Sequence, residues 1–493
     1  MLTYLKEEVN MTVTENGAAT HSTTGSDCLD LFATIGALRR VSQCEIETRF
    51  VRAFTENRDI AMKLLFFARD IRGGLGERKV FRVILKWLAE NEPDTVRKNL
   101  IHIAEYGRYD DLLVLMGTPC ETDMLDVLSE QFKADREALA SGAEVSLLGK
   151  WLPSVNASNR ETVCHAKKIA KYFGMKEADY RKALVALRAR IRILENHLRE
   201  RDYTFDYAKQ PSGAMYKYRA AFLRNDAARY STFIRKVTAG EEKLHADTLA
   251  PYQLVESYLN NGSLRSFIRG ISEEEKAVLN ATWSSLPDFG GDENMLAVID
   301  TSGSMYCTGK PLAASVALSL GLYFAERNTG HFRNHFIEFS VRPTLIEIKG
   351  DTFADRLRYV SSFNEIANTN LEAVFDLILK TAVKHNVPAS ELPAKLVIIS
   401  DMEFDRCVGN ASSTVFRNAK KKFEASGYRL PDVVFWNVAS HSTQQPVTAN
   451  EQGVVLVSGC TPRLFAMIAG GSMDPYTFMM EILEDERYAP ITA

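Results

Sequence analysis

The sequence predicts an α plus α/β protein, with an α-helical repeat array in its N-terminal half and a doubly wound α/β domain in its C-terminal half. From residue 28 to residue 283, apolar residues recur mainly at spacings of three and four, as in amphipathic helices. After residue 294, short continuous apolar runs alternate with amphipathic segments, a pattern typical of parallel strands buried between helices. The chain has 493 residues, 46% of them hydrophobic, which is enough for more than one globular domain.

The first 27 residues are polar and rich in Thr, Ser and Asn. They lack the basic, apolar and small-residue order of a secretory signal, and we expect them to form a disordered tail. No apolar run reaches the roughly eighteen residues that a membrane span requires, so we expect no membrane partner. Seven cysteines without CxxC pairs favour reduced thiols and a cytoplasmic location.

The region 28–283 is expected to form helix pairs of the HEAT-like repeat type. Amphipathic stretches such as "AMKLLFFARDI" and "VFRVILKWLAE" are separated by short segments with turn residues, including "RGGLGE" at 72–77 and "NEPD" at 91–94. Helix pairs without intervening strands are typical of α-solenoids and related arrays. The stretch 72–78, "RGGLGER", also matches an RGG-type RNA contact, but it occurs once and a turn between helices is favoured.

The segment 150–240 is strongly basic. It contains 20 Lys and Arg residues against 8 Asp and Glu residues, a net charge of +12 in a chain whose total is −3. A long helix is expected in it, with an apolar stripe from Leu184 to Leu198 flanked by arginines. Aromatic residues then alternate with basic residues in "YKYRAAFLRNDAARYSTFIRK".

This combination favours single-stranded nucleic acid, because basic side chains contact phosphates and aromatic rings stack on bases. We expect the charged ends of the RNA-binding residues to lie on one continuous surface. These predicted nucleic-acid-binding residues are Arg181, Arg188, Arg192, Arg199, Lys217, Arg219 and Arg224. The alternative, in which the rings belong to the core and the arginines are solvated helix surface, stays open.

Residues 284–294, "SSLPDFGGDEN", are a predicted linker, and the α/β domain is expected to span residues 295–485. A helix is expected to begin at Pro311. The predicted strands are "MLAVID" (295–300), "HFIEFS" (335–340), "PTLIEI" (343–348), "KLVIISD" (395–401), "DVVFWNVAS" (432–440) and "GVVLVSG" (453–459).

Hydroxyl and carboxylate side chains gather at the predicted ends of two of these strands. Asp300, Ser302 and Ser304 alternate after the first strand, so they share one face of an extended loop. Asp401 ends a later strand, and Thr369 precedes a predicted helix. Because ligands of open α/β sheets bind at the carboxyl ends of strands near the switch in strand order, we expect these five residues to converge. Their hard oxygen donors favour Mg²⁺ or another divalent cation.

Three alternatives concern the same stretch. Asp405 in "SDMEFD" is a second choice for the distant carboxylate. Asp300 and the two serines would alternatively cap the next helix. A phosphate-binding loop is the weakest alternative, because Pro311 stands where the GxxxxGK[ST] motif requires Ser or Thr.

The stretch "DTSGSM" after an apolar strand resembles the metal-ion-dependent adhesion site of von Willebrand factor A domains, whose motif is Asp-x-Ser-x-Ser with a distant Thr and Asp. The resemblance implies a Rossmann-like A domain in which Asp300, Ser302, Ser304, Thr369 and Asp401 hold the metal. It also implies a protein partner that supplies a carboxylate to the open metal position.

A helical-repeat half followed by such a domain resembles the Ro-type (TROVE-like) RNA-binding proteins, in which a ring of helical repeats is closed by an A domain. More closely, "KWLPS", "PSGAMYKYRAAFLRND" and "RDIRGGLGER" resemble an uncharacterised domain-of-unknown-function family of bacteria, viruses and plants. This resemblance implies RNA as a partner and a ribonucleoprotein as the functional assembly.

These features together predict a non-catalytic RNA-binding protein with a Mg²⁺-dependent protein-interaction domain. The alternative is a metal-dependent adaptor or chaperone that does not bind nucleic acid. A metal-dependent nuclease is less favoured, because two-metal chemistry uses several clustered carboxylates and this site offers two. The nine histidines form no HxxxH pair or Cys/His cluster that would indicate a zinc enzyme.

Overall fold

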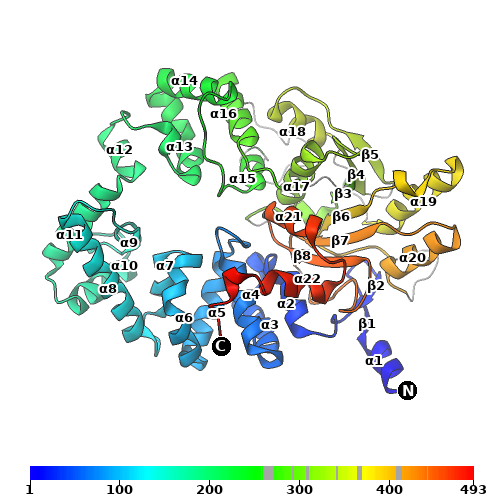
Figure 1. Ribbon diagram of the computed structural model, residues 1–493, viewed down its shortest axis with the longest axis horizontal. Helices are drawn as coiled ribbons and strands as arrows, with labels where there is room; N and C mark the ends of the chain where they lie inside the picture. The colour runs from blue at the N-terminus through cyan, green and yellow to red at the C-terminus, as the bar shows by residue number, and fades with distance from the viewer. Residues whose placement is uncertain are drawn as a thin grey trace.

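Helices α2 to α16 follow one another along an arc whose two ends both contact the α/β domain (Figure 1). The arc and the α/β domain together form a ring in this computed structural model. The structure describes residues 1–256, 258, 271–290, 294–306, 310–339, 342–363, 369–406, 413–440 and 442–493. Within these residues, no helix is both long enough and apolar enough to cross a membrane.

The predicted helical array is confirmed. Each helix buries one apolar face; in α5, for example, Val80, Ile84 and Leu88 are all buried. The helices are α2 (Asp27–Ile35), α3 (Gln43–Glu56), α4 (Arg58–Arg69), α5 (Arg78–Asn91), α6 (Pro93–Tyr106), α7 (Tyr109–Leu112), α8 (Glu121–Ala140), α9 (Leu148–Trp151), α10 (Arg160–Tyr172), α11 (Glu177–Ile191), α12 (Leu194–Glu200), α13 (Ser212–Asn225), α14 (Ala227–Thr238), α15 (Pro251–Glu256) and α16 (Glu273–Ser284). The stretch 72–78 lies between α4 and α5 and leads into α5, as a turn between helices would.

Residues 1–27, expected to be a disordered tail, are instead folded. They contain α1 (Leu2–Asn10) and an antiparallel hairpin of β1 (Met11–Val13) and β2 (Ala19–His21), whose strand β2 is buried. Composition was misleading here, because the polar side chains of this segment make specific hydrogen bonds. Thr14, for instance, is buried and donates its hydroxyl hydrogen to the carbonyl of Phe404, in a distant part of the chain.

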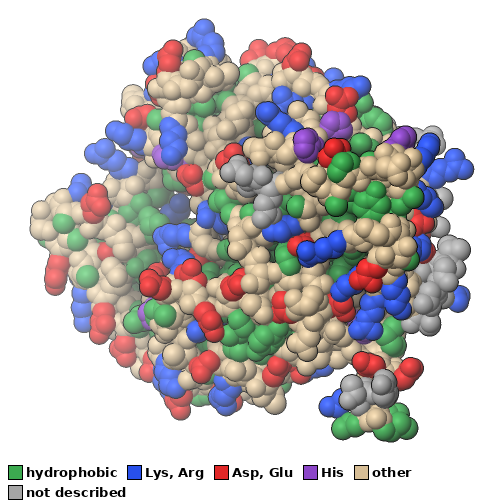
Figure 2. Space-filling view, turned by 45° about the vertical axis from the view of Figure 1, so that its right-hand side comes forward, with side chains coloured by type: hydrophobic (Ala, Val, Ile, Leu, Met, Phe, Trp, Pro, Cys, Tyr) green, Lys and Arg blue, Asp and Glu red, His purple; other side chains and the backbone are tan. Residues whose placement is uncertain are grey.

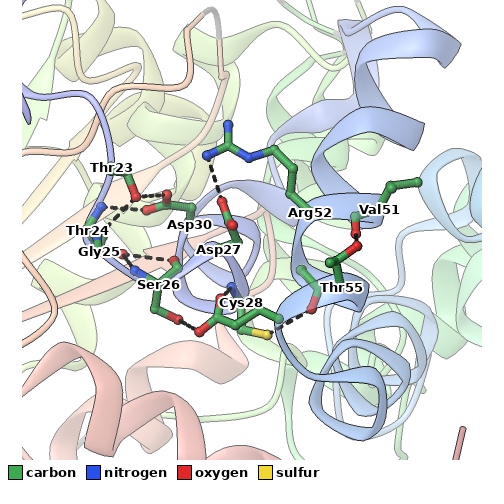
Figure 3. Close-up of polar contacts among 12 residues, drawn as sticks. Thr23, Thr24, Gly25, Ser26, Asp27, Cys28, Asp30, Val51, Arg52 and Thr55 are labelled. Carbon is green, nitrogen blue, oxygen red and sulfur yellow. Dashed lines mark hydrogen bonds and ion pairs between the residues drawn. The ribbon is translucent and has the colours of Figure 1, made fainter.

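The end of this N-terminal segment is fixed to the first two helices of the array (Figure 3). Ser26 caps α2, and its hydroxyl donates to Glu56 of α3 at 2.8 Å. The amide of Thr24 donates to the carboxylate of Asp30 at 2.8 Å. Arg52 of α3 forms an ion pair with Asp27 at 2.7 Å.

In the described part of the C-terminal half, six strands form a mixed sheet in the order β5-β4-β3-β6-β7-β8. The strands are β3 (Met295–Asp300), β4 (His335–Phe339), β5 (Thr344–Glu347), β6 (Lys395–Ser400), β7 (Asp432–Asn437) and β8 (Val454–Ser458). All neighbours are parallel except β4 and β5. Each predicted strand is present, and the predicted last residue of the second one, Ser340, lies outside the described residues.

Helices cover both faces of this sheet, because its central strands are apolar on both sides. Met295, Ala297 and Ile299 of β3 pack in one core with α17, while Leu296 and Val298 pack in a second core with α19 and α20. The helices of this half are α17 (Ala313–Arg327), α18 (Phe353–Ser361), α19 (Leu371–His385), α20 (Val415–Ala425), α21 (Arg463–Gly470) and α22 (Pro475–Leu483).

The ring closes through polar contacts at both ends of the array. At the first end, the amide of Gly36, just after α2, donates to the hydroxyl of Ser458 on β8 at 3.0 Å. At the other end, the carboxylate of Glu256 in α15 accepts from the amide of Leu312, just before α17, at 3.3 Å. Residues 485–493 continue past the α/β domain and pack on α4 and α6.

Candidate functional site

The first candidate site lies where the strand order of the sheet reverses. β3 is the first strand of the sheet in the chain; β4 pairs with one side of it and β6 with the other. Asp300 ends β3, and Asp401 directly follows β6, so both carboxylates leave the same edge of two neighbouring parallel strands. This is the place at which open α/β sheets bind ligands.

Asp300 is fully buried and is held by neutral donors. One of its oxygens accepts from the amide of Ser302 at 2.8 Å, and the other accepts from the hydroxyl of Ser400 at 2.5 Å. The hydroxyl oxygens of Ser302 and Ser304 are 3.0 Å apart, as expected for alternate residues of one loop face. Among the described residues, none forms an ion pair with Asp300.

Thr369 and Asp401 lie in two neighbouring loops and are both buried. The carbonyl of Thr369 accepts from the amide of Asp405 at 2.9 Å, which places residue 369 beside the loop that follows Asp401. Asp401 itself accepts from the amide of Glu403 at 3.3 Å. The structure therefore brings the β3 loop, the β6 loop and the segment before α19 to one sheet edge.

The donor set of this edge fits a divalent cation. Burial, together with the negative charge of the neighbouring Asp401, raises the pKa of Asp300 to about 7. The repulsion between two buried carboxylates is relieved either by protonation of one of them or by a cation between them. Hydroxyl and carboxylate oxygens are the ligands that Mg²⁺ prefers. Within the described part of the chain, no group of three or more His, Cys, Asp or Glu side chains could hold a metal, so this site would depend on its hydroxyl groups.

The helix-cap alternative does not account for these residues. A short 3-10 turn, Gly303–Tyr306, follows Asp300, and α17 begins only at Ala313 with Leu312 as its cap. The phosphate-loop alternative involves residues 307–309, which lie outside the described residues.

The second candidate site is a cavity of about 1100 Å³ inside the ring. Its walls come from segments far apart in the sequence, and the space-filling view shows a hollow left of centre bordered by Lys and Arg side chains (Figure 2). Among the residues that the structure describes, eight Lys and Arg residues line the cavity, against three Asp and Glu residues. The basic ones are Arg39, Arg69, Arg72, Arg78, Arg108, Lys150, Lys217 and Arg463.

Four of these cations form ion pairs with carboxylates of the protein. Arg39 pairs with buried Glu77, Arg69 pairs with buried Asp111, and both Arg78 and Arg108 pair with Asp110. In contrast, Arg72 donates to the carbonyl of Glu105, and Arg463 to the carbonyl of Asp247, which fixes each guanidinium without cancelling its charge.

Aromatic rings lie beside several of these cations. The Arg108 guanidinium lies over the ring of Trp151, 4.2 Å from its centroid, and the Lys150 ammonium is 5.3 Å from the same centroid. Arg463 lies over Phe289 at 5.3 Å. The cavity thus combines positive charge with half-buried rings.

The predicted nucleic-acid-binding residues do not form one continuous surface. Among them, Lys217 lines the cavity, while Arg181, Arg192 and Arg224 are exposed elsewhere. The predicted long helix ends at Ile191, because Arg192 adopts a left-handed conformation with φ 52°, and the chain starts again as α12.

Arg188 and Arg219 depart from the prediction, because their charged ends are engaged internally. Arg188 donates to the carbonyls of Gly149 and Leu152, both at 2.8 Å, at the end of α9. Arg219 has a side chain only 15% exposed; it lies over the ring of Tyr216 and forms an ion pair with Glu275 at 3.9 Å. Arg199 is exposed but is paired with the adjacent Glu200.

Three aromatic residues of the stretch 216–236 are core residues, as the alternative interpretation held. Phe222, Tyr230 and Phe233 are buried in a separate core cluster together with Tyr207. The ring centroids of Phe222 and Tyr230 lie 5.1 Å apart. These rings stabilise the array and are not free to stack on bases.

Sequence reasoning did not identify most of the cavity residues. The cavity draws on residues from position 39 to position 463, so no local motif marks it. One local signal was present, since residues 72, 74, 75, 76 and 78 of "RGGLGER" line the cavity. The stretch is therefore a turn between helices that also faces the cavity.

Two family models match the two halves of the chain separately. A sequence model of the family "Domain of unknown function (DUF7788)" matches residues 294–486. An uncharacterized protein of Acanthamoeba polyphaga mimivirus, L728, is 27% identical over 520 residues, covering 98% of this chain and 89% of the relative. The crystal structure of the Deinococcus radiodurans Ro (RSR) protein aligns with 12% identity and a TM-score of 0.49, covering 91% of this chain and 99% of that one.

The helical half matches a second family model. The family "Domain of unknown function (DUF2828)" matches residues 14–118 and 122–288, which together are more than half of the chain. The matched region begins inside the N-terminal hairpin and ends where the α/β domain begins. The chain therefore belongs to the DUF2828 family.

Proposed function

We propose that this protein is a non-catalytic RNA-binding component of a ribonucleoprotein that takes single-stranded RNA into its central cavity. In the same proposal, a Mg²⁺ ion at the edge of the sheet recruits a protein partner through a carboxylate. The observation that carries the RNA proposal is the convergence, on one cavity, of basic and aromatic side chains from around the ring.

The charge of the cavity supports an anionic ligand. Because Arg72 and Arg463 are held by backbone carbonyls, their full charge faces the cavity and their side chains lose little freedom on binding. Lys150 and Lys217 contact rings and keep their charge as well. Such fixed cations suit phosphate groups, which are the part of RNA that contributes most to affinity.

The rings favour a single strand over a duplex. Bases of a single strand are free to stack on side chains such as Trp151, Tyr252 and Phe289, which line the cavity and are half-buried. Base stacking is worth about 1–3 kcal/mol per base, so one or two such contacts would add substantially to the charge interaction.

The metal part of the proposal rests on the sheet-edge residues. Asp300, Ser302, Ser304, Thr369 and Asp401 would hold Mg²⁺ or another divalent cation, with Asp300 and Asp401 balancing its charge. The bound cation would supply an electrostatic anchor for a carboxylate of the partner protein. A cytoplasmic location is also proposed, supported by the five described cysteines, Cys28, Cys44, Cys120, Cys164 and Cys460, all of which are free thiols.

Fluorescence anisotropy with a labelled single-stranded RNA tests the RNA proposal. Wild-type protein should bind, and its affinity should fall with salt with a log–log slope of about −0.7 per phosphate contact. The variant Lys150→Glu/Lys217→Glu should bind more weakly and with a shallower slope, because both cations line the cavity. The matched control Arg181→Glu/Arg224→Glu changes the same charge at exposed sites outside the cavity lining and should bind nearly as the wild type.

The alternatives predict different results. An adaptor or chaperone without nucleic-acid binding predicts no salt-dependent binding of single-stranded RNA at micromolar protein. A nuclease predicts that the RNA is shortened when Mg²⁺ is added. If the cavity variant and the control weaken binding equally, the RNA binds to the outer surface of segment 150–240 and not in the cavity.

A further inference from the structure

The N-terminal hairpin contacts the loop that carries Asp401, although about 390 residues separate them in the chain. The turn between β1 and β2, residues 14–17, lies against residues 403–405. Thr14 donates its hydroxyl hydrogen to the carbonyl of Phe404 at 2.5 Å, and Asn16 donates its side-chain amide to the carbonyl of Glu403 at 2.7 Å. Gly17 forms a bridge with Asp405. We call residues 14–17 the clasp.

Glu403 joins the clasp to the proposed metal site. Its side chain is buried, and one carboxylate oxygen accepts from the amide of Glu15 at 2.9 Å. The same carboxylate accepts from Ser442 and Gln444 at 3.0 and 2.9 Å. The amide of Glu403 donates to the carboxylate of Asp401 at 3.3 Å, so the residue held by the clasp also orients Asp401.

The clasp reaches Thr369 through the same loop. Asp405, which pairs with Gly17, donates its amide hydrogen to the carbonyl of Thr369 at 2.9 Å. Two of the five proposed metal ligands, Asp401 and Thr369, are therefore one hydrogen bond away from residues that the clasp holds.

The clasp is itself fixed at its other end. The segment that follows β2 is tied to α2 and α3 by the contacts of Thr24 with Asp30 and of Ser26 with Glu56 (Figure 3). In between, the amide of Gln445 donates to the carbonyl of His21 at 2.8 Å. Because this connection is hydrogen-bonded at both ends, it restrains the loop at residues 401–405 more than a free tail would.

We infer that the clasp is a positioning element of the metal site, which sets the arrangement of Asp401 and Thr369 and thereby the affinity for the divalent cation. This inference rests on the proposed metal site. Residues that orient metal ligands through hydrogen bonds typically change metal affinity by tenfold to a hundredfold when they are replaced. The N-terminal segment thus belongs to the metal site of the α/β domain, although it lies in the half matched by DUF2828.

Isosteric replacement at Thr14 tests the inference in the full-length protein. Thr14→Val keeps the shape of the side chain and removes the hydroxyl that donates to the carbonyl of Phe404 and accepts from the amide of Ala18, whereas Thr14→Ser keeps the hydroxyl. Isothermal titration calorimetry with MgCl₂ should show that the dissociation constant rises by about tenfold or more in Thr14→Val and is nearly unchanged in Thr14→Ser. Thr12→Val, at a half-exposed position of β1, is the matched control and should bind as the wild type.

A second readout needs no metal. In metal-free protein, amide hydrogen exchange of the peptide spanning residues 400–406 should be faster in Thr14→Val than in the wild type, and Thr14→Ser should restore the slow exchange. Asn16→Ala replaces Thr14→Val in this experiment if Thr14→Val unfolds the hairpin. It removes the hydrogen bond from the exposed side chain of Asn16 to the carbonyl of Glu403, and exchange of the same peptide should again be faster than in the wild type.

The outcomes separate the inference from the proposed function. If the wild type binds Mg²⁺ and Thr14→Val and Asn16→Ala bind it equally well, the clasp does not position the ligands and the inference is wrong. If the wild type itself does not bind Mg²⁺, the proposed metal site is wrong, and the inference falls with it. Weaker binding in Thr14→Val with recovery in Thr14→Ser supports both.

Discussion

Replacing Asp70 by asparagine should loosen the C-terminal segment from the helical array. The Asp70 carboxylate is fully buried and accepts hydrogen bonds from the Arg487 guanidinium, one of them at 2.8 Å, and from the hydroxyl of Tyr488 at 3.1 Å. Residues 485–493 reach the first end of the array through this group, so it stabilises the closed ring.

The magnitude follows from the burial of the two partners. Breaking a fully buried ion pair costs about 3–5 kcal/mol. Because the Arg487 side chain is 31% exposed, water solvates it in the variant, and we expect a smaller loss of about 2 kcal/mol. A loss of this size corresponds to opening of the segment that is roughly thirtyfold more frequent, since 1.4 kcal/mol is a factor of ten.

Hydrogen exchange of the peptide spanning residues 485–493 measures this opening. Exchange should be roughly thirtyfold faster in Asp70→Asn, while the control Asp94→Asn, an 88% exposed member of a surface ion pair, should leave it unchanged. Equal exchange in Asp70→Asn and the wild type would refute the view that Asp70 fastens the segment.

The stabilisation by Asp70 should also depend on pH with a defined sign. Burial alone would raise the pKa of Asp70, but hydrogen bonds from Arg487 and from the backbone of Arg72 and Gly73 outweigh burial and lower it. A carboxyl group with a lowered folded-state pKa stabilises the protein above its unfolded-state value of about 3.9 and loses this effect as the pH falls through the folded-state value. The difference in melting temperature between wild type and Asp70→Asn should therefore persist from about pH 5 to 8 and shrink in acid.

Three further changes test other parts of the structure. Gly36→Ala should lower the melting temperature by several degrees, because the new methyl group would lie 2.4 Å from the carbonyl oxygen of Ser458, whereas Gly213→Ala, with no atom within 4 Å of its methyl group, should leave it unchanged or slightly raised. Phe222→Ala should destabilise the helical half by about 3–5 kcal/mol, since its ring is fully buried among other rings; denaturant unfolding would contradict this if it showed no loss. Asp300→Asn should abolish the rise in melting temperature that we expect MgCl₂ to cause in the wild type, and an equal rise in both proteins would exclude Asp300 as a ligand.

The fold was predictable because its signals are local. Most strands of the sheet are continuous apolar runs, and the longer helices carry their own periodic apolar faces, so no knowledge of distant contacts is required. The placement of Asp300 and Asp401 was predictable for the same reason, because each residue ends or follows an apolar strand and topology brings those ends together.

The remaining features depend on contacts between distant segments. Whether Arg188 faces solvent is decided by the carbonyls of Gly149 and Leu152 on another helix, and nothing near residue 188 indicates this. The polar N-terminal residues fold because partners such as Glu403 lie at the far end of the chain. The cavity exists only once the ring closes, so its lining has no sequence pattern of its own.

The most direct test of the RNA proposal is to locate a bound RNA on the protein. Full-length protein would be irradiated with a single-stranded RNA that contains 4-thiouridine, and cross-linked peptides would be identified by mass spectrometry. The proposal predicts cross-links to peptides containing Trp151, Tyr252 or Phe289, whose rings line the cavity. Cross-links confined to the exposed surface around Arg181 and Arg224, or none above the level seen with duplex RNA, would contradict it.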